Sequence, residues 1–164
     1  MSMDDQKQLE QELALAEKGR HEAIRRVGNY HFWGEMGYVQ DMVEGLKWYH
    51  RAIEQGSAMA AGKLGQCYLR GQGVERSYTK ALEYYQMATE LGDVMSYHAV
   101  GQILFEMGDV EEGMINMRKA LMCGYASDEL VSTVREGYRN GFITKDEYMY
   151  TLRKHQEAIG EMKK

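Results

Sequence analysis

Apolar residues recur at every third or fourth position along most of this chain, with polar residues between them, which is the spacing of one buried helix face. Residues 3–18 place Leu9 and Leu13 on such a face. The stretch "SDELVSTVREGYRNG" repeats the spacing near the other end, and "TKDEYMYTLRKHQEAIGEMKK" follows it. The pattern predicts an N-terminal capping helix at 3–18 and a degenerate helix pair, which acts as a cap, at 126–164.

The start of the final helix is marked by Thr144 and Glu147, which stand three residues apart in the arrangement of a capping box. Lysines at the end of the same stretch complement the negative end of a helix dipole. Because the chain begins with acidic residues and ends with lysines, both ends are predicted to be polar caps. Polar caps favour a monomer.

Glycines divide the middle of the chain at a nearly constant interval. The glycines that would close helices are separated by 37, 36 and 32 residues, and a second glycine follows each of the first three after nine residues. These residues are Gly19, Gly56, Gly92 and Gly124, with Gly28, Gly65 and Gly101 as the second set. A fixed period of this length is typical of helical repeats. We therefore predict helix–loop–helix repeats at 20–56, 57–92 and 93–124, the last with a short loop.

Small and aromatic residues follow the same period. The apolar stripe on the second helix of each predicted repeat begins with glycine or alanine, and in the first two repeats it continues with an aromatic pair. Small residues let two helix backbones approach closely, and large aromatic side chains fill the space on either side. We expect the partner helix to cross at Gly28 and Gly65. The alternative is an irregular helical bundle with coincidental glycines. The pattern favours an all-α fold of about nine helices in antiparallel pairs.

Composition excludes several classes of function. The net charge of −5 gives a mildly acidic surface, which argues against nucleic-acid binding. No apolar run reaches the roughly 18 residues of a membrane-spanning helix, and the acidic N-terminus is unlike a signal peptide. Cys67 and Cys123 lie far apart and match no metal-ligand spacing. Reduced thiols in the cytoplasm, or in the nucleus, are the simplest interpretation.

The stretch "KLGQCYLRGQGVERSYTKALEYYQMATELGD" resembles the Sel-one-like repeat, a relative of the tetratricopeptide repeat. The family pattern is matched in order by Leu64, Gly65, Tyr68, Gly71, Gly73, Val74, Lys80, Ala81, Tyr84, Tyr85, Ala88 and Gly92. The first repeat has an extra loop residue and carries His31 where the family has tyrosine, and the third repeat lacks the glycine loop. The resemblance implies a right-handed α-solenoid of antiparallel helix pairs, an α/α superhelix, that binds proteins.

The tail "VREGYRNGFITKDEYMYTLRKHQEAIGEMK" resembles the closing segment of Sel-one-like proteins of algae and related protists. In many of those proteins a zinc-binding RING-like domain precedes the repeats. No such domain appears in this sequence, because two cysteines cannot build one. The repeat arm of a larger RING-type, ubiquitin-ligase-like protein therefore stands as an alternative function.

Candidate catalytic and metal-binding patterns are missing. The five histidines show no ligand spacing, and the sequence has neither a Gly-x-Ser-x-Gly motif nor a phosphate-binding loop with its lysine. His31 is predicted to pack between helices, and Cys67 to be a small buried thiol in a first helix. We expect no enzymatic activity, no cofactor and no metal.

The resemblance to tetratricopeptide proteins implies that the first helix of each pair lines a concave groove. Counted from the glycine of each first helix, the next residue and those four and five positions beyond the glycine would face the groove. The implied residues are Asn29, Phe32, Trp33, Gln66, Leu69, Arg70, Gln102, Phe105 and Glu106, and His98 joins them one turn earlier. We predict a non-enzymatic adaptor that binds a protein or peptide there.

Several interpretations of these residues are open. The amides of Asn29, Gln66 and Gln102 could hydrogen-bond an extended peptide backbone, or they could be ordinary polar residues of a solvated face. Trp33 would either anchor a partner or cover the first loop. Thirteen methionines and twelve tyrosines also permit a self-associating scaffold.

Overall fold

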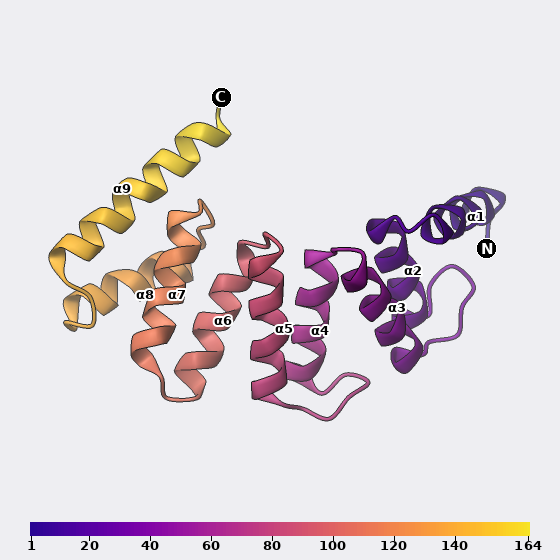
Figure 1. Ribbon diagram of the computed structural model, residues 1–164, viewed down its shortest axis with the longest axis horizontal. Helices are drawn as coiled ribbons and strands as arrows, with labels where there is room; N and C mark the ends of the chain where they lie inside the picture. Colours follow the sequence, from indigo (N-terminus) through magenta and orange to yellow (C-terminus); the bar gives the residue numbers. More distant parts are fainter. The chain divides into compact units, whose positions relative to one another are not determined.

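The computed structural model describes residues 1–164, which form nine α-helices joined by short loops and no strand (Figure 1). The helices are α1 (Met3–Glu17), α2 (His21–Trp33), α3 (Met42–Glu54), α4 (Ala58–Arg70), α5 (Tyr78–Glu90), α6 (Met95–Glu106), α7 (Val110–Met122), α8 (Asp128–Arg139) and α9 (Lys145–Met162). The predicted all-α repeat fold is confirmed. None of these helices is both long and apolar enough to cross a membrane.

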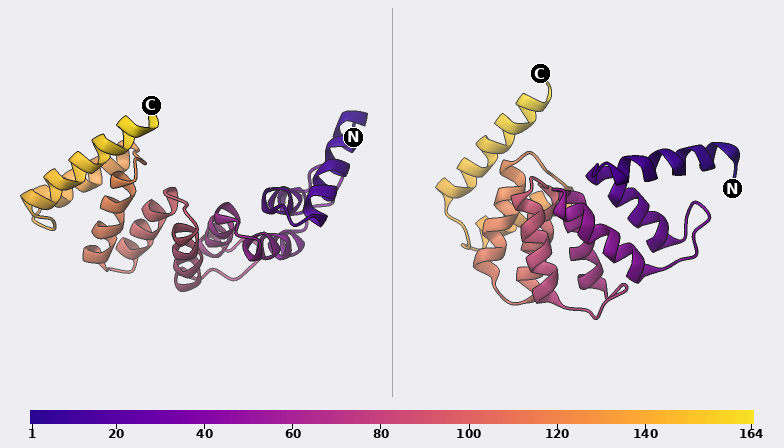
Figure 2. Two further views of the ribbon diagram at one scale, coloured as in Figure 1. Left: turned by 45° about the horizontal axis from the view of Figure 1, so that its top comes forward. Right: turned by 45° about the vertical axis from the view of Figure 1, so that its right-hand side comes forward.

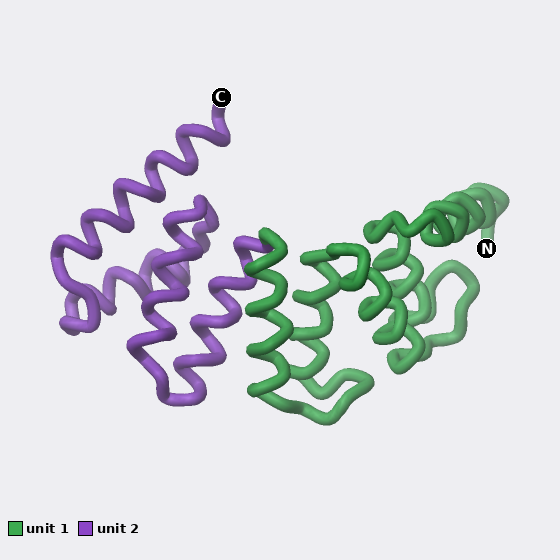
Figure 3. The backbone as a smooth tube through the Cα atoms, in the orientation of Figure 1, with its two compact units in different colours: residues 1–92 green, residues 93–164 purple.

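The helices fall into two compact units, residues 1–92 and residues 93–164 (Figure 3). Unit 1 holds α1 to α5, and unit 2 holds α6 to α9. Within unit 1, α2 packs against α3 and α4 against α5, and within unit 2, α6 packs against α7 (Figure 2). The boundary between the units lies where the second repeat was predicted to end. Each of these pairs is an antiparallel helix hairpin.

Local sequence signals fix the ends of the helices. Gly56 and Gly92 adopt φ angles of 92° and 99°, a left-handed conformation that glycine adopts without strain. At the start of α9, the backbone N–H of Thr144 donates to Glu147 Oε2 at 2.8 Å, and the N–H of Glu147 donates to Thr144 Oγ1 at 3.2 Å. Both the closing glycines and the capping box are therefore confirmed.

In unit 1 the two helices of each pair approach at a glycine. A Cβ atom on Gly28 would lie 3.0 Å from Cβ of Trp48, and a Cβ atom on Gly65 would lie 2.7 Å from Cδ2 of Tyr85. Carbon atoms not bonded to each other do not normally come this close, so only glycine fits. The prediction that the partner helix crosses at Gly28 and Gly65 is confirmed.

Unit 2 has a core of its own, to which α7, α8 and the loop before α9 contribute. Its fully or nearly buried side chains are Met114, Met117, Leu121, Leu130, Val134 and Ile143. Polar bonds attach α9 to α7. The guanidinium of Arg118 donates through Nε to Thr151 Oγ1 at 2.9 Å, and His155 Nδ1 donates to the carbonyl oxygen of Leu121 at 2.9 Å. The long final helix is thus a docked part of unit 2.

Candidate functional site

The first helices of the repeats expose one polar stripe each, which we call the first-helix face. In unit 1 it consists of Asn29 and Trp33 of α2 with Lys63, Gln66 and Arg70 of α4, and in unit 2 of His98, Gln102 and Glu106 of α6. Of the predicted groove residues, the structure places on this face Asn29, Trp33, Gln66, Arg70, His98, Gln102 and Glu106. Because these residues follow one another at intervals of three or four along each helix, they share a side of it.

Trp33 is the most prominent apolar side chain on the first-helix face of α2. Trp33 is the last residue of α2 and is 47% exposed, whereas the residue before it, Phe32, lies in the core. The two rings meet edge to face, with centroids 4.8 Å apart. One side of the indole therefore packs on the protein, and the other side is free to contact a partner.

The amide of Asn29 is hydrogen-bonded within its own repeat. The buried hydroxyl of Tyr49 donates to Asn29 Oδ1 at 2.6 Å. Burial raises the pKa of Tyr49 well above its ordinary value, so the phenol keeps its proton and remains the donor. The carbonyl oxygen of Asn29 thus joins α2 to α3, which corrects its predicted role in a ladder of free amides.

The position four residues after each glycine does not face solvent in the first repeat. Phe32 is 2% exposed, and a Cβ atom on Gly45 would lie 2.6 Å from its Cβ. Phe105 is half-buried, and a Cβ atom on Gly113 would lie 2.5 Å from its Cδ1. These rings fill the contact between the two helices of one repeat, and Leu69 is half-buried at the equivalent place. The prediction that Phe32 lines an exposed groove is therefore wrong.

The first-helix face of α4 carries positive charge that no acid neutralises. Neither Lys63 nor Arg70 forms an ion pair, and Gln66 lies between them on the same side of the helix. On α2, by contrast, Arg25 pairs with Glu22 at 2.9 Å and Arg26 with Glu12 at 2.7 Å. The cations of α4 are available to an acidic ligand.

The first-helix face of unit 2 differs in charge from that of unit 1. Gln102 donates through Nε2 to Glu129 Oε1 of α8 at 3.2 Å, and Glu106 is exposed. His98 is half-buried, with its ring centroid 5.8 Å from that of Tyr125 and its Nε2 without a hydrogen-bond partner. Burial lowers the pKa of His98, which favours the neutral ring near neutral pH. This part of the face is neutral to acidic.

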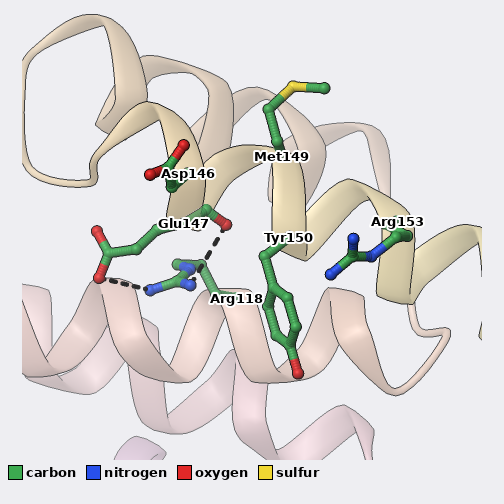
Figure 4. A pocket seen from close by; sticks show the side chains of 6 residues that line it. All are labelled: Arg118, Asp146, Glu147, Met149, Tyr150 and Arg153. Carbon is green, nitrogen blue, oxygen red and sulfur yellow. Dashed lines mark hydrogen bonds and ion pairs between the residues drawn. The ribbon is translucent and has the colours of Figure 1, made fainter.

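A hollow of about 610 Å³ lies between α7 and α9 in unit 2 (Figure 4). Arg118 reaches across it, and its guanidinium contacts both the carboxylate of Glu147, at 3.4 Å, and the carbonyl oxygen of that residue, at 3.3 Å. Met149, Tyr150 and Arg153 of α9 line the rest, with Asp146. Repeat spacing did not predict this cluster, because its residues come from two helices, α7 and α9, that α8 separates in the chain. Since the N–H groups of Arg118 already bond α9, the cluster serves to dock that helix.

The remaining candidates for chemistry are the thiol of Cys67, the ring of His31 and possible metal ligands. Burial raises the pKa of the Cys67 thiol to about 11, so it is a protonated thiol rather than a nucleophilic thiolate. His31 packs between Tyr38 and Trp48, with ring centroids at 4.1 and 5.8 Å, as predicted. No three or more histidine, cysteine, aspartate or glutamate side chains gather in an arrangement that could hold a metal ion.

Comparison with known families places repeats where the helix pairs of unit 1 lie. The family model of the Sel1 repeat matches residues 21–57 and 58–93, which contain α2 with α3 and α4 with α5. Two solved structures share the fold: a Sel1 repeat protein from Oxalobacter formigenes and c5321, a protective antigen of uropathogenic Escherichia coli strains that displays an SLR fold. Each has a TM-score of 0.74 at 22% identity, over 93% and 91% of this chain and 64% and 33% of the solved chains.

Among curated proteins, two relatives from Arabidopsis thaliana are similar to part of the chain. The ERAD-associated E3 ubiquitin-protein ligase component HRD3B is 34% identical over 87 residues, which are 52% of this chain and 13% of the relative. Component HRD3A is 34% identical over 58 residues, 35% of this chain and 9% of the relative. The chain therefore matches only a small part of the length of either relative.

Proposed function

We propose that this chain, in which residues 21–57 and 58–93 match the Sel1 repeat, is a non-enzymatic interaction module that binds an extended segment of another protein. The binding surface is the first-helix face of unit 1. The two units differ in charge along this face, so unit 1 takes the main part in our proposal. As a protein with two free cysteines and no disulfide, it would work in a reducing compartment such as the cytoplasm or nucleus.

One observation carries this proposal. Lys63 and Arg70 form no ion pair on α4, while Trp33 exposes about half of its indole on α2. Unpaired cations on one first helix and an exposed aromatic ring on the other favour a ligand with carboxylates and an apolar side chain, because aromatic anchors and charge complementarity dominate such contacts. Gln66 adds an amide that can bond a peptide backbone between the two cations.

The test is a selection of peptides from a random phage-displayed library against the whole chain. We expect enrichment of peptides with Asp or Glu next to an apolar residue. Trp33→Ala and Arg70→Glu should each weaken their binding by about tenfold or more, measured by isothermal titration calorimetry. Lys7→Glu is the matched control, because Lys7 is an exposed, unpaired cation of α1 in the same unit.

Circular dichroism would first show that each variant is folded. Selected peptides that bind Trp33→Ala and Arg70→Glu as tightly as the wild type would contradict the proposal. Sedimentation of the same protein over a concentration series tests the alternative of a self-associating scaffold. A mass that rises with concentration would favour the scaffold, whereas we expect a monomer.

The similarity to the curated relatives favours one kind of protein assembly in which this module would act. Because both are named as components of an E3 ubiquitin-protein ligase associated with ERAD, we propose that the segment bound here belongs to a ubiquitin-ligase assembly. The chain would then serve as a repeat arm that joins two proteins. Proximity labelling in cells, with the chain as bait, should enrich ubiquitin-ligase subunits above an Arg70→Glu bait, and equal enrichment would argue against this setting.

A further inference from the structure

The loop between α2 and α3 projects from unit 1 (Figures 1 and 2). Two aliphatic side chains in and next to this loop are exposed. Val39 in this loop is 87% exposed, and Val43 in the first turn of α3 is 56% exposed. Their neighbours Tyr38 and Met42 pack against the core of unit 1. Tyr38 and Met42 thus point toward the core, and Val39 and Val43 are exposed to solvent.

The fold does not require these exposed valines, as the second repeat shows. Val39 stands two residues before the N-cap Asp41, and Glu75 stands two residues before the N-cap Ser77. Val43 and Thr79 stand two residues after the same caps. The second repeat therefore forms the same helix hairpin with polar residues at both places. An exposed pair of aliphatic residues that the fold does not need is available to a partner protein.

The charge around the valines also differs from that of the second repeat. Residues 34–46 hold Glu35, Asp41 and Glu44 but no lysine or arginine. Glu44 is partly neutralised by Lys47 at 3.3 Å, whereas Glu35 forms no ion pair. The corresponding stretch of the second repeat, 71–82, carries two cations and one acid. The first loop is therefore an apolar patch with an acidic rim.

We propose that this loop surface, formed by Val39 and Val43 with Glu35, Asp41 and Glu44, docks a basic segment of a partner protein. The segment presents aliphatic side chains flanked by lysine or arginine, because its apolar groups cover the valines while its cations face the acidic rim. This site shares no residue with the first-helix face, whose cations select the opposite charge. One module can therefore hold two segments of opposite charge.

Two synthetic fluorescent peptides test the site, a basic one with the sequence KKLVLKK and an acidic one with the sequence EELVLEE. Fluorescence anisotropy should show that the whole chain binds the basic peptide. The double variant Val39→Glu/Val43→Thr, which installs the residues of the second repeat, should weaken this binding by about tenfold. General attraction between charges predicts the reverse, because the variant adds a negative charge to the protein.

Glu35→Lys should also weaken binding of the basic peptide, and Glu10→Lys is its matched control. Glu10 is exposed on α1 and forms no ion pair, so both changes alter the net charge equally. Equal losses in these two variants, or unchanged binding to the double valine variant, would overturn the proposal. So would failure of the basic peptide to bind, or a dimer that Val39→Glu dissociates, which would make a second copy the occupant. Loss of the acidic peptide through Arg70→Glu concerns only the first-helix face.

Discussion

At the scale of single residues, glycine sets how closely the helices of one repeat approach. Gly65 on α4 lies under the ring of Tyr85 on α5, and Gly28 on α2 lies under Trp48 and Tyr49 of α3. In both helix pairs of unit 1, an aromatic side chain of the second helix therefore packs directly against the backbone of the first helix. This arrangement buries a large apolar area without a gap.

Gly65→Ala is expected to lower the free energy of unfolding by about 1–3 kcal/mol, because its methyl group would lie 2.7 to 2.9 Å from three ring carbons of Tyr85 and force the helices apart. Urea denaturation followed by circular dichroism measures the change. Gly160→Ala is the control, since nothing lies within 4 Å of a Cβ atom placed there. Alanine in that exposed turn of α9 should be neutral or slightly stabilising. Equal effects at the two positions would show that propensity, not the close approach, governs Gly65.

At the scale of helices, polar pairs decide how the terminal elements are attached. Glu12 of α1 is only 6% exposed, and its Oε1 accepts a hydrogen bond from Arg26 Nη1 at 2.7 Å. Gln8 of the same helix donates to the hydroxyl of Tyr30 at 3.4 Å. A buried carboxylate that depends on one cation makes the position of α1 sensitive to that cation.

Arg26→Ala should therefore destabilise unit 1 by about 1–3 kcal/mol, because it leaves the Glu12 carboxylate buried without a counter-charge. The loss is smaller than for a fully buried pair, since the Arg26 side chain is itself half-exposed. Hydrogen exchange should show faster exchange of α1 amides in the variant. Addition of Glu12→Gln should restore much of the stability, which a simple loss of side-chain packing would not allow.

The control for this element is Arg25→Ala. Arg25 pairs with Glu22 of the same helix, whose side chain is 42% exposed, so Arg25→Ala leaves no buried carboxylate without a counter-charge and should destabilise the protein less than Arg26→Ala. If Arg25→Ala and Arg26→Ala destabilise the protein equally, the burial of Glu12 does not control the attachment of α1.

At the scale of the whole molecule, the two units have separate hydrophobic cores. The core of unit 1 is built from α1 to α5 and the loops between them, and that of unit 2 from α6 to α9. No residue of one core cluster comes from the other unit. Each unit therefore contains the apolar contacts that a cooperative fold requires.

Residues 1–92 expressed alone are therefore expected to fold. They should show the far-ultraviolet circular dichroism of a helical protein and a single cooperative urea transition. They should also bind the acidic and basic peptides described above, because both proposed surfaces lie in unit 1. A chain of residues 1–92 without helical signal would contradict the independence of this core.

Much of the fold could be predicted from the sequence. Where the sequence marked a helix end, the structure agrees within a residue or two, because caps such as Thr144 with Glu147 and closing glycines such as Gly56 act through bonds between neighbouring residues. Repeat spacing likewise revealed that Gly28 and Gly65 meet a partner helix. Stretches a few residues long hold all the information that these features need.

The candidate site could be predicted only in part. A helix turns by about 100° per residue, so Phe32 and Trp33 can point in very different directions, and repeat spacing alone did not show which is buried. The packing of α3 against α2 buries Phe32 between the two helices and brings the hydroxyl of Tyr49 to Asn29. The same holds for Val39, whose exposure depends on how its loop folds over the core.

The sequence by itself determined the all-α repeat architecture, the helix boundaries and the glycine contacts, because periodicity and local hydrogen bonding specify them. Only the tertiary structure decided which polar groups pair between helices, such as Arg118 with Thr151, and which charges remain unpaired, such as Arg70. The physical reason is that pairing and exposure depend on distances between residues far apart in the chain. Those distances are set by the packing of whole helices.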